Sequence, residues 1–197
     1  MKRNNNSILL VRYDDDRDTF TFDFERDNIN YTIKLENVCH DIVQFEKCYY
    51  YGYVLSEDVD VEVRAEFVRT IKFPDFFNDK KDVDFFVSKT VGVLDSYVSL
   101  PKYNVVVYPE SMSELNRKML SYLSRIAEVE YIKQEDIVEG CIGETVLKSI
   151  VNSNIIVLDD MSISDTMIYD LLNMLRRFNG TNYIVVVSLY GGRFVRQ

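Results

Sequence analysis

The sequence predicts an α/β protein in which a parallel sheet flanked by helices follows an antiparallel, β-rich N-terminal segment. Three observations predict this class. Short strand-like runs fill residues 7–73, strand and helix patterns alternate from residue 83 onward, and two of the later strands are continuously apolar. We expect a β-rich segment at residues 1–80 and an α/β domain at residues 81–197. A chain of 197 residues can bury a substantial core.

The N-terminal segment shows strand periodicity and predicts an antiparallel meander. Clusters of Asp, Asn and Arg typical of turns separate the first runs, which are rich in Phe, Thr, Ile and Tyr. Phe20, Phe22 and Phe24 alternate with polar residues, which places the three rings on one face of a half-buried sheet. From residue 59 to residue 67, apolar residues alternate with charged ones, which predicts a further strand. The predicted strands are residues 8–13, 19–25, 30–35, 49–55 and 60–67.

The second half of the chain alternates between helix and strand. Apolar residues at three- and four-residue steps predict an amphipathic helix at 83–98, which Pro101 ends. Apolar runs such as Ile155, Ile156, Val157 and Leu158 lack alternation, so both faces of these strands should be covered, as in a parallel sheet. The further predicted strands are 104–108, 129–132, 154–158 and 183–189, and the further predicted helices are 113–126 and 166–178.

Composition excludes several functional classes. The chain carries 23 Lys and Arg against 32 Asp and Glu, a formal charge of −9, so we expect no nucleic-acid partner and no anionic-membrane binding. The polar first residues and the short apolar runs predict an intracellular, cytoplasmic and soluble protein. Three cysteines and a single histidine, His40, make Ser-His hydrolysis and His-rich metal chemistry poor candidates. The run from Tyr49 to Tyr51, with Tyr53, is interpreted as sheet packing or an oligomer contact rather than as a base-stacking platform, because the chain is acidic.

The segment 154–166 carries the clearest chemical signal. Four apolar residues deliver two acids, Asp159 and Asp160, to the carboxyl end of a buried strand, and a short polar loop then enters a helix. Open α/β sheets bind ligands at that edge. Backbone N–H groups at a helix N-terminus suit a phosphate, while paired acids suit sugar hydroxyls or hydrated Mg²⁺.

This segment resembles the phosphoribosyl-diphosphate signature of type I phosphoribosyltransferases, in which four hydrophobic residues and two acids precede a loop ending in Thr-Gly-x-Thr or Ser-Gly-x-Thr. The resemblance implies a phosphoribosyltransferase-like fold and Mg²⁺-dependent transfer of ribose 5-phosphate from phosphoribosyl diphosphate to a nitrogenous base or nucleotide. It implies that Asp159 and Asp160 contact the ribose hydroxyls as catalytic and metal-binding acids. The residues that would wrap the 5′-phosphate are Ser162, Ile163, Ser164, Asp165 and Thr166. Dimers are common among similar enzymes, so the resemblance also allows a homodimer.

The loop departs from the family pattern. In an ungapped alignment Asp165 occupies the position of the loop glycine, whereas a one-residue deletion would place Ser164 there and Thr166 on the final threonine. An Asp facing a phosphate would repel it by about 1 kcal/mol in solvent. The alternative function is therefore a catalytically degenerate binding or assembly module that uses the β-rich half as its interaction surface. A regulator that senses a nucleotide is a third alternative.

A second match to the family lies after the strand at 104–108. Similar enzymes place their diphosphate-binding loop there, and the corresponding residues are Pro109, Glu110, Ser111, Met112 and Ser113. Ser113, with Asn116 nearby, could equally cap the following helix. The resemblance also places a loop that closes over the substrate within residues 133–153.

Overall fold

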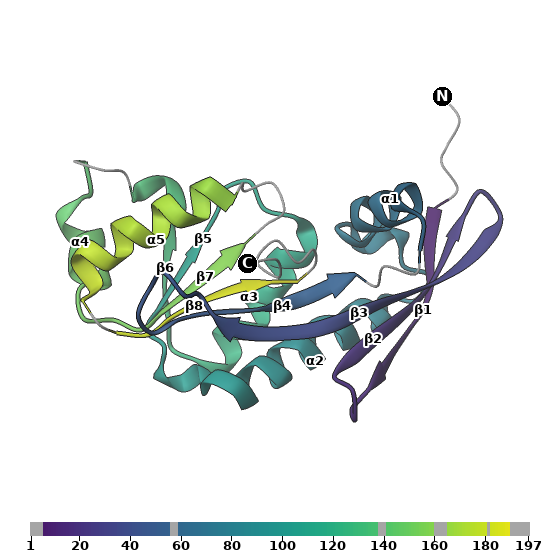
Figure 1. The fold of residues 1–197 in the computed structure, drawn as a ribbon, viewed down its shortest axis with the longest axis horizontal. Coiled ribbons are helices and arrows are strands. Elements are labelled where there is room, and N and C mark those ends of the chain that lie inside the picture. Colours follow the sequence, from purple (N-terminus) through teal and green to yellow (C-terminus); the bar gives the residue numbers. More distant parts are fainter. Residues whose placement is uncertain (1–5, 56–58, 138–140, 160–164, 181, 190–197) are drawn as a thin grey trace.

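The computed structural model describes residues 6–55, 59–137, 141–159, 165–180 and 182–189, and these build one mixed α/β sheet flanked by helices (Figure 1). The sheet has eight strands in the order β1-β2-β3-β4-β8-β7-β5-β6. The strands are β1 (Asn6–Asp14), β2 (Thr19–Arg26), β3 (Ile29–Asp41), β4 (Cys48–Leu55), β5 (Val105–Tyr108), β6 (Glu130–Lys133), β7 (Ile155–Asp159) and β8 (Ile184–Ser188). The α-helices are α1 (Val61–Ile71), α2 (Lys80–Val98), α3 (Glu114–Ile126), α4 (Glu144–Ile150) and α5 (Asp165–Asn179). Three short 3-10 helices are η1 (Pro74–Phe76), η2 (Leu100–Lys102) and η3 (Gln134–Asp136).

Strands β1 to β4 form the predicted antiparallel meander. Phe20, Phe22 and Phe24 are fully buried on one face of β2, as their alternation predicts. The rings of Phe22 and Phe67 meet edge to face with centroids 5.2 Å apart. Away from this core, the Arg12 and Asp23 side chains form a salt bridge at 2.7 Å. An antiparallel sheet tolerates charged side chains on one face because only its other face needs to be covered.

Strand β4 joins the antiparallel and parallel parts of the sheet. It runs antiparallel to β3 on one side and parallel to β8 on the other. Its Gly52 lies beside Ser188, and a Cβ atom at Gly52 would stand 2.7 Å from the Ser188 carbonyl oxygen and 2.8 Å from the Tyr50 hydroxyl oxygen. A glycine is therefore required by close approach in β4.

Strand order in the parallel part reverses once. In chain order β5 comes first, then β6 on one side of it and β7 and β8 on the other, so the direction changes between β5 and β7. Helices α1, α2 and α3 share one hydrophobic core with one face of the sheet. Buried residues of α4 and α5 pack in a second core on the opposite face (Figure 1). Both faces of the parallel strands are thus covered, as their unbroken apolar runs predict.

One predicted strand is wrong. Residues 60–67 fall largely in helix α1, which begins after Asp60, whose side chain accepts a hydrogen bond from the Glu62 N–H group at 2.8 Å. The buried positions are Val63, Phe67, Val68, Thr70 and Ile71. Their spacing is helical, whereas Val61 of the alternating pattern is 68% exposed. The alternation that suggested a strand was coincidental.

The remaining predicted elements are confirmed with shifts of a few residues at their ends. Gly180 has a φ of 67° just after α5, the left-handed conformation expected of a helix C-cap. Residues 133–153, expected to hold a closing loop, contain η3 and the short helix α4 among the residues that the structure describes.

Candidate functional site

The two loops singled out from the sequence begin at neighbouring strands. Residues 109–113 follow β5, and residues 160–164 follow β7, which pairs directly with β5. The strand order reverses between these two strands. In open α/β sheets the connections diverge at such a point and leave a crevice at the carboxyl ends of the strands, where ligands bind. The two predicted loops therefore start from neighbouring strands at the point where such a crevice is expected.

Asp159 ends β7 and is buried, with 3% of its surface exposed. Its carbonyl oxygen accepts a hydrogen bond from Asn116 Nδ2 at 3.4 Å. Asn116 lies in the first turn of α3 and is 2% exposed. This contact ties the start of α3, which follows the first loop, to the end of β7, where the second loop begins. The sequence offered Asn116 only as a helix-cap partner, so its bridging position was missed.

The loop after β5 is held by contacts of its own. Ser113 is the N-cap of α3, and its hydroxyl oxygen accepts a hydrogen bond from the Asn116 N–H group at 3.3 Å. The Glu110 N–H group donates to both carboxylate oxygens of Glu135, at 3.0 and 3.1 Å. Lys133 Nζ lies 2.8 Å from Glu110 Oε1, and this hydrogen bond lowers the pKa of the Glu110 carboxyl group. The Glu135 carboxylate thus already accepts from a backbone N–H group of the loop predicted to meet a diphosphate.

The other residues of this loop differ in burial. Pro109 is buried, Met112 is half-buried, and Ser111 is exposed. Among the described residues of this loop, Ser111 is thus the exposed one that carries a hydroxyl group.

Part of the predicted phosphate site lies outside the described residues. These predicted residues are Asp160, Ser162, Ile163 and Ser164. Asp165 and Thr166 form the first turn of α5 in the backbone, and their side chains also lie outside the description. The orientation of Asp165 relative to the loop is thus still a matter of prediction.

A magnesium ion at this site would need more ligands than the described side chains supply. No group of three or more His, Cys, Asp or Glu side chains that could hold a metal ion occurs within the described ranges. Mg²⁺ is commonly held by one or two carboxylates together with substrate phosphates and waters. Asp159, at the crevice, fits that donor set only if a phosphorylated ligand supplies most of the coordination.

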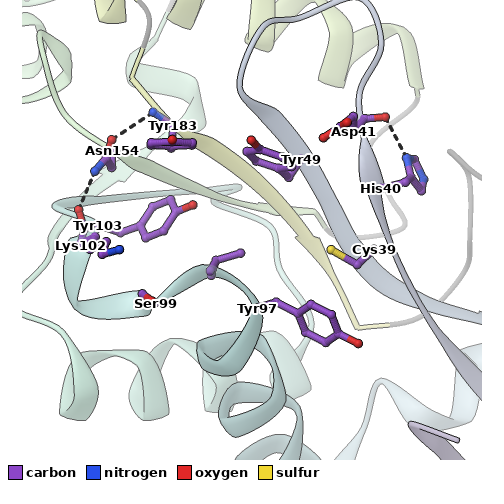
Figure 2. A pocket seen from close by; sticks show the side chains of 11 residues that line it. Cys39, His40, Asp41, Tyr49, Tyr97, Ser99, Lys102, Tyr103, Asn154 and Tyr183 are labelled. Atoms are coloured by element: carbon purple, nitrogen blue, oxygen red, sulfur yellow. Dashed lines mark hydrogen bonds between the residues drawn. The ribbon is translucent and has the colours of Figure 1, made fainter.

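A separate cleft opens at the opposite, amino edge of the parallel strands (Figure 2). It has a volume of about 560 Å³ and draws its walls from the end of β3, the start of β4, the end of α2 and the residues preceding β5, β7 and β8. The lining residues used below are Asp41, Tyr49, Lys102, Tyr103, Asn154 and Tyr183. The sequence interpretation assigned Tyr49 to sheet packing. The sequence signal for this cleft is a tyrosine at the start of three strands: Tyr49 lies at the start of β4, Tyr103 shortly before β5 and Tyr183 directly before β8.

Searches of protein-family models, curated proteins and solved structures each gave no match to this chain. In the part of the chain that the structure covers, none of the helices has both the length and the apolar character needed to cross a bilayer. Function must therefore be inferred from the two sites themselves.

Proposed function

We propose that the crevice between β5 and β7 binds phosphoribosyl diphosphate with Mg²⁺ and that the protein is a phosphoribosyltransferase-like enzyme, transferring ribose 5-phosphate to a nitrogenous base or nucleotide. One observation carries the proposal. The two loops that resemble the family's diphosphate-binding and phosphate-binding loops follow the pair of strands at which the sheet order reverses. That is where an open α/β sheet holds its ligand.

The proposed reaction requires charge stabilisation but no covalent nucleophile. Breaking the bond between the anomeric carbon and diphosphate builds positive charge on the ribose and negative charge on the leaving group. Asp159 and Asp160 would stabilise the ribose and orient its hydroxyls, and Ser111 would donate to the diphosphate. Mg²⁺, when bound, would neutralise charge on the diphosphate. Asn116 acts as a positioning residue, because its side chain fixes the end of β7.

The loop after β7 would hold the other end of the ligand. Ser162, Ser164 and Thr166 would bind the 5′-phosphate together with the backbone N–H groups at the start of α5. The acceptor base would enter from a part of the crevice that the resemblance does not define.

Calorimetry with phosphoribosyl diphosphate and Mg²⁺ tests the proposal. Binding in the micromolar to millimolar range is expected for the intact chain. Asp159→Asn removes one charge that accepts ligand hydroxyls and should weaken binding about 10- to 100-fold, the equivalent of one hydrogen bond to a charged group. Asp170→Asn, on an exposed position of α5, is the matched control and should bind normally. No heat of binding at millimolar ligand would eliminate the transferase function.

A second candidate is a phosphoribosyltransferase-fold module that binds or assembles without catalysis. The contact from the Glu110 N–H group to the Glu135 carboxylate favours it, because a carboxylate occupies a donor that a diphosphate would use. Asp165 in the other loop adds a second negative charge, as the sequence shows.

Two substitutions separate the candidates. Glu135→Gln removes a charge close to the loop and should strengthen diphosphate binding by up to about fivefold, given roughly 1 kcal/mol between solvated charges. Asp165→Gly should strengthen phosphate binding in the same way. If the unsubstituted chain fails to bind and both variants gain binding, the site is a degraded one. Sedimentation analysis of the intact chain would then show whether it assembles, as a homodimer or with a partner.

A further inference from the structure

The amino-edge cleft has a wall of aromatic rings. Tyr49, in β4, and Tyr183, just before β8, stack with ring centroids 6.0 Å apart and planes 22° from parallel. Because β4 and β8 are adjacent parallel strands, the sheet itself holds the two rings side by side. Figure 2 shows them above the open part of the cleft. Aromatic faces of this kind stack well on flat rings of a ligand.

A hydroxyl group points into the same space. Tyr103 is only 4% exposed, and its ring directs the hydroxyl group toward the middle of the cleft (Figure 2). Across the described residues, no hydrogen bond to this hydroxyl is found. Burial, and then the nearby Tyr49 and Tyr183, raise the pKa of Tyr103, so the group is a neutral donor at physiological pH. A donor that faces a cleft and has no protein acceptor is available to an acceptor on a ligand.

The segments beside the rings are fixed in place. Asn154 Nδ2 donates to the Lys102 carbonyl oxygen at 2.8 Å, and Asn154 Oδ1 accepts from the Tyr183 N–H group at 3.0 Å. The Asn154 side chain therefore fixes both the backbone of Tyr183 and the segment at Lys102 that leads to Tyr103. A cleft built this way is largely formed before any ligand arrives.

The charges around the cleft do not select strongly for an ion of either sign. Asp41 and Lys102 carry opposite charges and lie on opposite sides of it (Figure 2). Lys47 Nζ already lies 5.5 Å from the centroid of the Tyr183 ring, so a ligand cation would meet a like charge there. An anionic ligand would be attracted by Lys102 but repelled by Asp41. A flat, uncharged ligand that accepts hydrogen bonds meets neither penalty.

We propose that this cleft binds a neutral, planar nitrogen heterocycle, which stacks on Tyr49 and Tyr183 and accepts a hydrogen bond from the Tyr103 hydroxyl group. A volume of about 560 Å³ is large enough for one or two fused rings with a sugar attached. The site lies at the edge of the sheet opposite the proposed phosphoribosyl-diphosphate crevice. The two proposals are therefore independent.

Titration of the intact chain with adenosine and thymidine, followed by NMR, tests the inference. Binding at millimolar concentration or tighter is expected for at least one nucleoside. Tyr183→Leu removes a stacking ring and should weaken binding about 5- to 100-fold. Tyr103→Phe removes only the hydroxyl group and should weaken it about tenfold. Tyr131→Leu is the matched control, because Tyr131 is 40% exposed on β6 and does not line the cleft.

Three results would overturn the inference. The first is that neither nucleoside binds. The second is that a nucleoside binds the Tyr183→Leu variant and the intact chain with equal affinity. The third is that tetramethylammonium binds and the nucleosides do not. Adenosine monophosphate distinguishes the source of the heterocycle. If adenosine monophosphate binds more tightly than adenosine and Lys102→Gln abolishes this difference, the natural ligand is a nucleotide. If the two bind equally, it is a free base or a nucleoside. Asp159→Asn should leave nucleoside binding unchanged, which separates this test from that of the proposed transferase.

Discussion

Replacing Arg176 should destabilise the fold more than its position in the last turn of α5 suggests. Its Nη1 atom donates to Asn179 Oδ1 at 3.0 Å, to the Gly180 carbonyl oxygen at 3.1 Å and to the Asn182 carbonyl oxygen at 2.6 Å. Its Nη2 atom donates to the Glu46 carbonyl oxygen. One guanidinium group therefore joins the end of α5 to the segments that enter β8 and β4.

The size of the effect follows from these contacts. Hydrogen bonds that involve a charged group contribute about 1.5–3 kcal/mol each. The three acceptors of Nη1 compete for two protons, so Nη1 makes two full bonds. These two bonds alone, without the Nη2 bond to Glu46, lead us to expect that Arg176→Met lowers the free energy of unfolding by at least about 3–6 kcal/mol. Methionine keeps most of the apolar stem, so the loss reports mainly on the guanidinium group.

Urea denaturation followed by circular dichroism measures this loss. Arg69→Met is the matched control: the Arg69 side chain is 73% exposed and pairs with Glu66 within its own helix. That substitution should cost less than about 1 kcal/mol. Equal unfolding midpoints for Arg176→Met and Arg69→Met would refute the reasoning.

Three further predictions concern the sheet and its covering helices. Gly52→Ala should cost about 1–3 kcal/mol of stability, because the new methyl group would lie 2.7 Å from the Ser188 carbonyl oxygen; thermal unfolding measures it. Phe67→Ala should cost about 3–5 kcal/mol and Val61→Ala less than about 0.5 kcal/mol, since α1 buries the first residue and exposes the second; a strand with both residues on its buried face would give a clear loss at each. Burial raises the pKa of Tyr53 to about 12 against about 10 in an unfolded chain, so stability is retained below pH 10 and falls as the pH rises toward 12. Tyr53→Phe should flatten that alkaline decline in urea midpoints, and an unchanged decline would contradict it.

Sequence periodicity predicted most elements because their burial is simple. The strands around Val106 and Ile156 are covered on both faces and show unbroken apolar runs. Phe20, Phe22 and Phe24 show the two-residue period of a sheet with one buried face. Such patterns are local, so a single chain suffices to recognise them.

The helix α1 shows where a local pattern misleads. Val61, Val63 and Phe67 satisfy both a two-residue period and, in part, a helical one. The decisive residues, Val68 and Ile71, lie beyond the alternating run. Including them, together with Asp60 as an N-cap, would have favoured the helix.

Contacts between distant segments could not be predicted from the sequence. The pairing of Gly52 with Ser188, the hydrogen bond from the Glu110 N–H group to Glu135 and the bond from Asn116 to Asp159 each join separate elements. The tyrosine cleft likewise assembles only when the amino ends of several strands meet. Periodicity predicts which face a residue occupies but not which neighbour it meets.

The double pairing of β4 has a consequence for any shortened form of the protein. A fragment starting at residue 81 would lack β4 and leave the backbone donors and acceptors along one side of β8 uncovered. Residues Ile184 to Val187 are apolar on both faces, so this newly exposed strand edge would favour pairing with another chain. We expect such a fragment to self-associate, whereas a cut placed between β3 and β4 would leave β8 protected.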